Sequence, residues 1–200
     1  MPEKPRRPRR QQILEALALE LENRPGARIT TARLAEVVGV SEAALYRHFP
    51  SKAKMFEALI EFAEESMFGL ANRILAEDVD ATRRCERILT MLLTFSDRNP
   101  GITRILLGEA LLGEHERLRA RVSQFFDRFE TQLKQILREG ELVSELGMRA
   151  SVAAIANLLM AVVEGRMTQF SRSGFQHSPM ESWEQQWQAL QVGLFPGAGR

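Results

Sequence analysis

The chain has 200 residues, of which 44% are hydrophobic and 26% charged, and its 27 lysines and arginines nearly balance 26 aspartates and glutamates. This composition is typical of a globular protein long enough to bury a sizeable core. The single cysteine, Cys85, excludes an intrachain disulfide. No apolar run is long enough to span a bilayer or resembles a signal peptide, so we expect a cytoplasmic protein with no membrane partner.

Positive charge is concentrated at the N-terminal end. The first 56 residues hold 11 basic and 6 acidic residues, whereas the remaining 144 hold 16 and 20. A basic end on a mildly acidic body is typical of a protein that binds nucleic acid at one end. Residues 1–8 combine prolines with basic residues, and we expect them to form a disordered basic arm. The arm would lie along a phosphate backbone or in a minor groove, or else remain a solvated tail.

Apolar residues recur at helical spacing along the whole chain, and no stretch shows sustained period-two alternation. Pro25-Gly26 ends the first stripe, and Asn99-Pro100-Gly101 interrupts the pattern near the middle of the chain. The sequence therefore predicts an all-α protein. The expected helices cover residues 13–21, 30–38, 41–49, 51–70, 81–96, 102–112, 118–137, 151–170 and 180–194.

Residues 28–52 predict two short helices joined by a tight turn. Thr30 and Ser41 are typical N-caps for the two helices. Gly39 can take the positive φ that a helix end commonly requires, and the small Ala35 lets the two helices cross closely. Such a helix-turn-helix places its second helix in the DNA major groove.

The second of these helices has a smooth face that carries one long side chain. Leu45 and Phe49 point into the core, whereas Ala43, Ala44 and Arg47 point the other way. Arginine can reach a guanine edge, and side chains at the shoulders and flanks can reach phosphates. The predicted DNA-binding residues are Arg9, Arg10, Thr30, Thr31, Arg33, Ser41, Ala43, Ala44, Tyr46, Arg47, His48 and Lys52.

The string Val-Ser-Glu-Ala-Ala-Leu-Tyr-Arg-His-Phe-Pro-Ser-Lys at residues 40–52 closely resembles the signature of the TetR family of regulators. In that family the recognition helix ends in a similar aromatic-x-His-Phe-x-x-Lys run. The resemblance implies a three-helix DNA-binding domain over residues 9–56. It also implies a helical dimerisation and partner-binding domain over residues 57–200, whose last two helices join two copies on palindromic double-stranded DNA.

Two helices in the last third of the chain look too apolar for the surface of a monomer. The run from Val152 to Val163 is apolar nearly all round, and Trp183 begins a second stripe at helical spacing. We expect a homodimer that can assemble further on DNA, because two recognition helices related by a two-fold axis read a palindrome. An intramolecular helix pair is the alternative. The predicted dimerisation residues are Ile155, Leu159, Val162, Trp183, Trp187 and Leu190.

Catalytic and cofactor-binding motifs are absent from the sequence. His115-Glu116 begins like a zinc-protease motif but lacks the second histidine four residues on. Glu109, Glu114 and His115 lack a fourth convergent ligand, so a solvated loop explains them better than a metal site. We therefore expect no enzyme activity, no cofactor and no metal.

The resemblance continues beyond the DNA-binding end, to one branch of the TetR family, the nucleoid occlusion factors. It is carried by residues 51–62, 98–106 and 133–139 and by the late Glu164-Gly165. Members of that branch bind chromosomal palindromes and, when bound to DNA, antagonise polymers of the division protein FtsZ, so that septa avoid the nucleoid. The resemblance implies a protein associated with the nucleoid.

The same resemblance implies an FtsZ-binding surface at Phe62, Arg98 and Asn99. An exposed phenylalanine beside an arginine could take both parts of an acidic tail with apolar residues. Leu70 and Thr94 depart from the pattern of the branch, which carries a basic residue and a glycine there. The alternatives are a core position for Phe62 and a plain helix end at Arg98 and Asn99.

The competing function is a ligand-responsive TetR-type repressor. In that case the helices of the body would enclose a cavity, and a bound small molecule would separate the recognition helices. Met91, Phe95, Phe125 and Phe129 could line such a cavity or fill a core.

Overall fold

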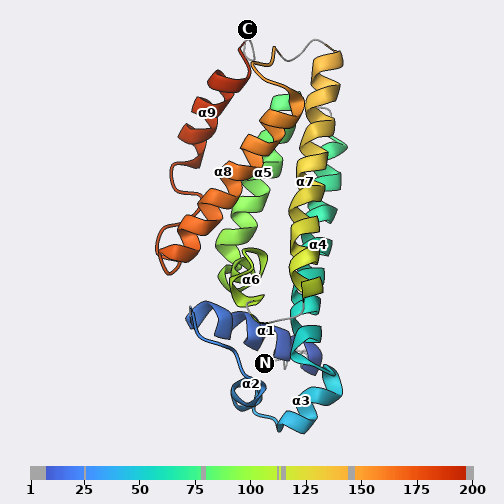
Figure 1. Ribbon diagram of the computed structural model, residues 1–200, viewed down its shortest axis with the longest axis vertical. Helices are drawn as coiled ribbons and strands as arrows, with labels where there is room; N and C mark the ends of the chain where they lie inside the picture. Colours follow the sequence, from blue (N-terminus) through green and yellow to red (C-terminus); the bar gives the residue numbers. More distant parts are fainter. Residues whose placement is uncertain are drawn as a thin grey trace, which may run out of the picture. The chain divides into compact units, whose positions relative to one another are not determined.

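The computed structural model describes residues 8–24, 26–77, 80–111, 113, 116–143 and 147–196 (Figure 1). These residues form helices and turns and contain no strand, which confirms the all-α prediction. The α-helices are α1 (Arg9–Asn23), α2 (Thr31–Val38), α3 (Glu42–His48), α4 (Lys52–Leu75), α5 (Ala81–Arg98), α6 (Pro100–Leu106), α7 (Glu116–Leu142), α8 (Val152–Arg172) and α9 (Trp183–Leu194), with a 3-10 helix η1 at Glu109–Leu111.

The chain divides into two compact units. The first contains the residues up to Ala63 together with Asn99–Val122, and the second contains Glu64–Arg98 and the residues from Ser123 onward. Helices α4 and α7 contribute to both units, and α6 belongs to the unit of the predicted DNA-binding helices. The functional boundary between residues 56 and 57 stays a prediction.

Side-chain caps define the short helices as the sequence predicts. The hydroxyl of Thr30 accepts a hydrogen bond from the backbone N–H of Arg33 at 3.3 Å, and that of Ser41 accepts one from Ala44 at 3.2 Å. Gly39 ends α2 with φ of 71°. Each N-cap satisfies a backbone donor that has no partner within its helix, so the turn between α2 and α3 is fixed locally.

The core of the first unit forms where α1 meets α2, α3 and α6. Ile13 and Leu17 of α1 and Leu45 and Phe49 at α3 are buried. Helix α6 approaches α1 very closely, because a Cβ added at Gly101 would lie 2.0 Å from the carbonyl oxygen of Ala18. Only glycine fits there.

The buried Arg104 of α6 makes a second link to α1. Its Nη1 donates to the carbonyls of Leu21 at 2.6 Å and Arg24 at 3.1 Å. Carbonyls at the end of a helix have no partner within it, so the guanidinium caps the C-terminus of α1.

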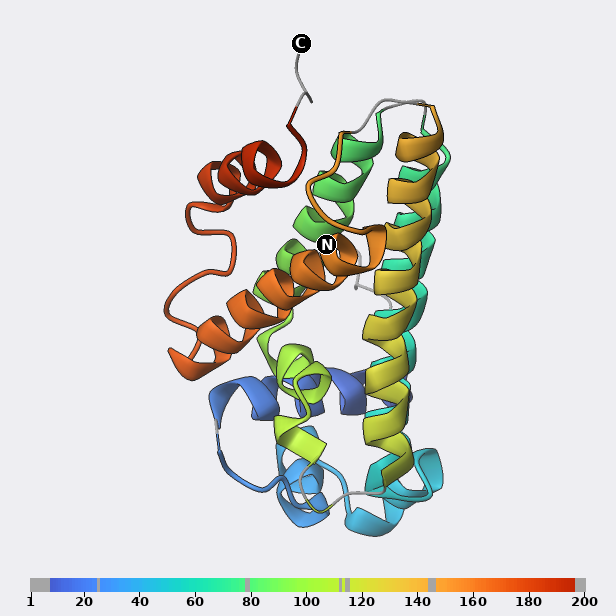
Figure 2. The ribbon, with the colours of Figure 1, turned by 45° about the horizontal axis from the view of Figure 1, so that its top comes forward.

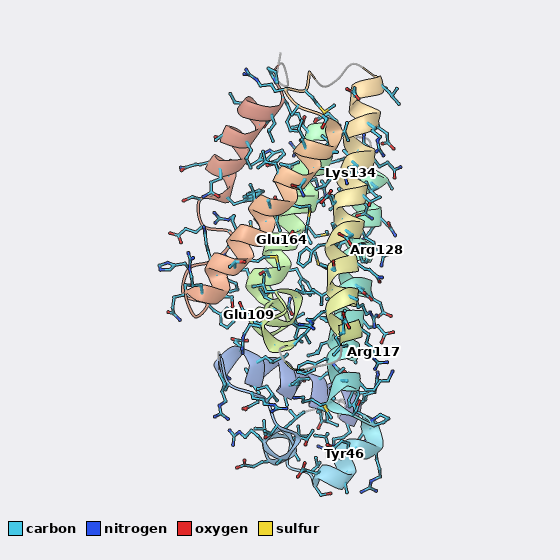
Figure 3. All side chains as sticks on the ribbon, viewed as in Figure 1. Tyr46, Glu109, Arg117, Arg128, Lys134 and Glu164 are labelled. Atoms are coloured by element: carbon cyan, nitrogen blue, oxygen red, sulfur yellow. The ribbon has the colours of Figure 1, made fainter. Side chains whose placement is uncertain are left out.

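Aromatic rings fill the part of the second unit between α4 and α7. Phe68 stacks on Phe129 with ring centroids 4.6 Å apart, and Phe125 meets both rings edge-on. Arg128 covers Phe68 from outside, with its guanidinium carbon 3.5 Å from the ring centroid (Figure 3). Phe125 and Phe129 thus fill a core.

Helix α8 packs on α5, and α9 lies beside them (Figure 2). Trp183 of α9 donates its indole N–H to the hydroxyl of Thr90 on α5 at 2.8 Å. Cys85 of α5 is completely buried, and this burial raises the pKa of its thiol to about 12. A buried thiol with a raised pKa is unreactive, so Cys85 is a core residue.

Two predicted helices are shorter in the structure, whereas others, such as those expected over 13–21, 51–70 and 118–137, extend to Arg9–Asn23, Lys52–Leu75 and Glu116–Leu142. The helix expected over 102–112 is interrupted, because α6 ends at Leu106 and Gly108 takes φ of 76° before η1 begins. The last helix begins at Trp183 rather than Met180, after a turn in which Ser182 has φ of 56°. Val38 and Val40, on either side of Gly39, are half-buried.

Candidate nucleic-acid interface

Helix α3 presents the face predicted to enter a major groove. Ala43, Arg47 and His48 are exposed and Ala44 is half-buried, whereas Leu45 on the opposite side is completely buried. The small alanines leave room for a base pair to approach, and the arginine extends beyond them.

A chain of hydrogen bonds joins α3 to the start of α2. The hydroxyl of Tyr46 donates to that of Thr31 at 3.3 Å, and Thr31 donates to the carboxylate of Glu42 at 2.8 Å. Tyr46 remains 43% exposed (Figure 3). Sequence reasoning assigned Tyr46 and Thr31 to DNA but missed Glu42, whose only local signal is an acidic residue in the first turn of α3.

Arg33 is held by two carboxylates of its own unit. It bridges Glu36 at 2.9 Å and Glu20 at 3.4 Å, and these hydrogen bonds raise the pKa of the Arg33 guanidinium. Glu20 is buried, so the bridge ties α2 to α1. This geometry gives Arg33 a role in positioning α2, besides the predicted contact with DNA.

Three of the predicted DNA-binding cations lie at the starts of α1 and α4. Lys52 at the start of α4 donates to the carbonyl of Ile29 at 3.2 Å and lies 5.8 Å from the ring centroid of Phe56. Arg10 lies 4.9 Å from the ring centroid of Phe49, and Arg9 donates to the neighbouring Gln12. Residues 1–7 of the predicted arm lie outside the described residues.

The other side of α4 carries a cluster of two cations around one carboxylate. Lys54 bridges Glu57 at 2.6 Å, and Arg117 at the start of α7 bridges it at 2.5 Å (Figure 3). The hydrogen bond from Lys54 and the charge of Arg117 lower the pKa of the Glu57 carboxyl, against the effect of burial. The cluster fixes α7 to α4 within the first unit.

Two family models match this chain and together cover most of it. The model described as "Bacterial regulatory proteins, tetR family" matches residues 13–59, and the SlmA-like model described as "Tetracyclin repressor-like, C-terminal domain" matches residues 79–194. Nucleoid occlusion factor SlmA of Shewanella pealeana is 56% identical over 186 residues, which cover 93% of this chain and 94% of that protein.

The chain belongs to the SlmA branch of the TetR family. Nucleoid occlusion factor SlmA of Alteromonas mediterranea is 57% identical over 182 residues, which cover 91% of this chain and 93% of that protein. The TetR resemblance found in residues 40–52, and its extension to the occlusion factors, are both confirmed. These homologues are DNA-binding regulators rather than enzymes.

Solved structures of more distant TetR-type regulators share the fold. The MbdR regulator from Azoarcus sp. CIB has a TM-score of 0.80 at 15% identity, with 95% of this chain and 98% of that chain covered. FadR from Bacillus halodurans has a TM-score of 0.75 at 16% identity, with the same two shares covered. Identities this low show the fold alone.

The residues predicted to bind FtsZ lie at helix surfaces and ends. Phe62 on α4 is 48% exposed, which excludes the core position considered as its alternative. Arg98 is the exposed last residue of α5, and Asn99 precedes Pro100 at the start of α6. Phe62 and Asn99 belong to the first unit and Arg98 to the second.

The two departures from the SlmA-like pattern lie in different surroundings. Leu70 on α4 is 39% exposed. Thr94 on α5 is half-buried, and its hydroxyl lies 3.6 Å from the sulfur of Met180 in the segment before α9. Thr94 therefore contributes a contact within the second unit.

Four of the six predicted dimerisation side chains are buried inside a single chain. Ile155, Leu159, Trp183 and Trp187 are at most 4% exposed, and only Val162 and Leu190 are half-buried. A side chain already covered by its own chain offers no surface to a second copy, so the four are corrected to intramolecular core residues. The helical stripe of tryptophans marks the face of α9 that packs on α5, through the bond from Trp183 to Thr90.

Other residues of the same two helices face outward. Ala154, Leu158, Ala161 and Gly165 are exposed along one face of α8, at the spacing i, i+4, i+7 and i+11. On α9 the exposed apolar residues are Ala189 and Val192, the latter 74% exposed. Small residues in such a row let a neighbouring helix approach closely.

No helix in the described part of the chain is long and apolar enough to cross a membrane. Among the same residues, no group of three or more histidine, cysteine, aspartate or glutamate side chains could hold a metal ion. Glu114 and His115, weighed above as metal ligands, lie outside the described residues.

Proposed function

We propose that this protein is a nucleoid occlusion factor that binds palindromic DNA on the chromosome as a homodimer, antagonises FtsZ polymers there and so regulates where the division septum forms. The observation that carries the proposal is the 56% identity to the nucleoid occlusion factor SlmA of Shewanella pealeana over 93% of the chain. A cytoplasmic protein associated with the nucleoid follows from this function.

DNA recognition in the proposal rests on Arg47 for base readout and on the surrounding groups for phosphates. Arginine donates two parallel hydrogen bonds to a guanine edge. Tyr46, His48, Lys52, Arg9 and Arg10 would reach phosphate oxygens, which position the protein on the duplex. The bridge of Arg33 to Glu20 and Glu36 supports the reading face by holding α2 in place.

Two copies would join through the outward faces of α8 and α9. Each recognition helix reads one half of a palindrome, so a two-fold axis doubles the contacts and multiplies the affinity. The assignment is supported by the exposed row on α8 that consists of Ala154, Leu158, Ala161 and Gly165. In a monomer this apolar face would stay exposed to water, which is unfavourable.

FtsZ would bind at Phe62, Arg98 and Asn99. The exposed ring of Phe62 can take an apolar side chain, and Arg98 can pair with a carboxylate of an acidic tail. Asn99 would add a polar contact.

The alternative, a ligand-responsive repressor, is not favoured. The curated relatives that share 56–57% identity over more than nine-tenths of the chain are occlusion factors. The ring contacts of Phe68, Phe125 and Phe129 also fill the region where Phe125 and Phe129 would have lined a cavity.

Sedimentation of FtsZ polymers tests the proposal. GTP-assembled FtsZ is spun down with the protein alone, with the protein and a palindromic duplex, and with the protein and a scrambled duplex. We expect the palindromic duplex to give the largest loss of pelleted FtsZ. Unchanged FtsZ polymers in all three samples, with the protein bound to its duplex, would contradict the proposal and leave a TetR-type regulator without this partner.

A further inference from the structure

Arg33 of α2 is bound by two carboxylates that differ in their surroundings. Its Nε donates to Glu20 of α1 over 3.4 Å, and its Nη1 donates to Glu36 of α2 over 2.9 Å. The side chain of Glu20 is 10% exposed, whereas that of Glu36 is 71% exposed. The bond to Glu20 joins two helices and the bond to Glu36 stays within one, so the two carboxylates serve different purposes.

The bond to Glu36 contributes little to the stability of the fold. It joins residues three positions apart at the surface, where water screens the attraction of the two charges. Glu20 differs, because a nearly buried carboxylate that loses its counter-charge is strongly destabilising. Arg33 therefore has one partner that the fold requires and one that it can exchange.

The cluster of Arg33, Glu20 and Glu36 carries one negative charge in excess, although it belongs to the basic end of the chain. Arg33 is the third residue of α2, in the same turn as Thr31, which is hydrogen-bonded to Tyr46 of the predicted recognition helix. The phosphates of a duplex repel an exposed carboxylate. Glu36 is thus unfavourable for DNA binding at this position.

A phosphate can replace Glu36 at Arg33 while Glu20 keeps its bond. Carboxylates and phosphates both match the N–H groups of a guanidinium, and Glu36 occupies Nη1, at the end of that group. The side chain of Arg33 is 42% exposed, so an anion from outside can approach it. Its Nε stays on Glu20 during the exchange, which holds the guanidinium in place.

We propose that Glu36 competes with DNA phosphate for Arg33, and that this competition lowers the affinity of the protein for duplex DNA of any sequence. The inference rests on the proposed function, in which this end of the chain binds DNA. To bind a phosphate, Arg33 leaves Glu36, and the freed carboxylate is then repelled by the duplex. Phosphate contacts carry no sequence information, so palindromic and random DNA are affected alike. Weaker backbone binding limits occupancy of the many non-specific sites on a chromosome.

Fluorescence anisotropy on a palindromic and a random duplex tests the competition. Glu36→Gln keeps the size of the side chain and removes its charge. We expect the Kd to fall about threefold or more on both duplexes, because each bound copy gains a free cation. Glu61→Gln neutralises an exposed carboxylate of α4 in the same unit and should leave the Kd nearly unchanged. An unchanged Kd in Glu36→Gln, or an equal gain in Glu61→Gln, would overturn the proposal.

A double-mutant cycle separates competition for Arg33 from direct repulsion of DNA by Glu36. In the background Arg33→Gln no cation is left to release, so adding Glu36→Gln should change the Kd by less than about 1.5-fold. An undiminished gain in this background would show that Glu36 acts on DNA directly, and would overturn the competition. If Arg33→Gln fails to fold, Glu20→Gln is added to both proteins of the comparison, so that no buried carboxylate stays unpaired.

Thermal unfolding distinguishes the two partners of Arg33. Arg33→Gln should lower the melting temperature, because it leaves the carboxylate of Glu20 without its counter-charge. Glu36→Gln should leave the melting temperature nearly unchanged. A comparable fall in both variants would make Glu36 a structural partner and contradict the exchange.

This inference and the proposed function fail in different ways. A wild type that binds palindromic and random duplexes equally well would contradict both. A wild type that prefers the palindrome, together with a Glu36→Gln variant that binds no more tightly, would contradict only the competition for Arg33.

Discussion

The hydroxyl of Tyr46 on α3 donates to the hydroxyl of Thr31 at the start of α2, over 3.3 Å. The hydroxyl of Thr31 in turn donates to the carboxylate of Glu42 at 2.8 Å. The recognition helix is thus anchored at two points to the helix that supports it, through side chains on the surface predicted to face DNA. Anchoring of this kind reduces the conformational entropy that binding would otherwise cost.

Tyr46→Phe and Thr31→Val should each weaken binding to the palindrome several-fold, and together little more than Thr31→Val alone. The reason is that both remove the bond between Tyr46 and Thr31, whose net contribution is about 0.5–1.5 kcal/mol, while Thr31→Val also removes the bond to Glu42. The melting temperature of the free protein should change little, because the bond is exposed. Fluorescence anisotropy on the four proteins of the cycle measures the coupling, and fully additive losses would show that the two hydroxyls act separately.

Arg47→Ala should weaken binding to the palindrome by about 1–3 kcal/mol per half-site and relax sequence preference at one base position. Lys52→Ala should weaken palindromic and random DNA evenly and flatten the salt dependence, because it removes a phosphate contact. The two variants are compared by anisotropy over a salt series on both duplexes. If Arg47→Ala still distinguishes palindromic from random DNA as well as the wild type does, the assignment of base readout to α3 is wrong.

Leu158→Glu and Val192→Glu should give folded monomers. Each places a carboxylate on the outward face proposed to join two copies, where desolvation without a partner costs several kcal/mol. Val143→Glu is the matched control, because it exchanges an exposed apolar residue at the end of α7. Analytical ultracentrifugation measures the oligomeric state, and circular dichroism checks that each variant is folded. Dimers in both test variants would show that the interface lies elsewhere.

Trp187 shows where sequence reasoning reached its limit. Its stripe with Trp183 correctly indicated a helix with one apolar face, but the same stripe suits a second chain and the protein's own α5 equally well. The bond from Trp183 to Thr90 decides for α5, and it joins residues 93 positions apart. Trp187→Glu should therefore unfold the second unit rather than only separate a dimer.

The caps and the turn between α2 and α3 were predictable because the residues that form them are close in the sequence. Thr30, Ser41 and Gly39 act within four residues of themselves, so their caps and the turn between α2 and α3 could be read directly. Arg104 was missed because its two carbonyl partners lie 83 and 80 positions away, at the end of α1. An arginine in an apolar segment gives no local sign of such partners.

Gly101→Ala should destabilise the protein by about 1–3 kcal/mol or more, because the new methyl group would meet the backbone of Ala18 rather than a movable side chain. For a chain of this size the melting temperature falls by about 2–4 °C per kcal/mol. Gly69→Ala is the control. This helical glycine has open space around it, so alanine should stabilise α4 by about 0.5–1 kcal/mol. Equal melting temperatures for the two variants would contradict the close packing of α6 on α1.

The most direct test separates FtsZ antagonism from DNA binding in one variant. Arg98→Asp combined with Asn99→Ser lies outside α3, so affinity for the palindrome should stay within roughly threefold of the wild type. Loss of a buried, hydrogen-bonded charge pair in the complex with FtsZ typically costs about 2–5 kcal/mol. Arg83→Asp, an exposed arginine of the same helix, controls for charge alone. The measurement is the fraction of FtsZ pelleted in the presence of each DNA-bound protein. We predict that the wild type and Arg83→Asp reduce it and the double variant does not. Equal reduction by all three proteins would contradict the assigned FtsZ surface, and no reduction by the wild type would contradict nucleoid occlusion through FtsZ.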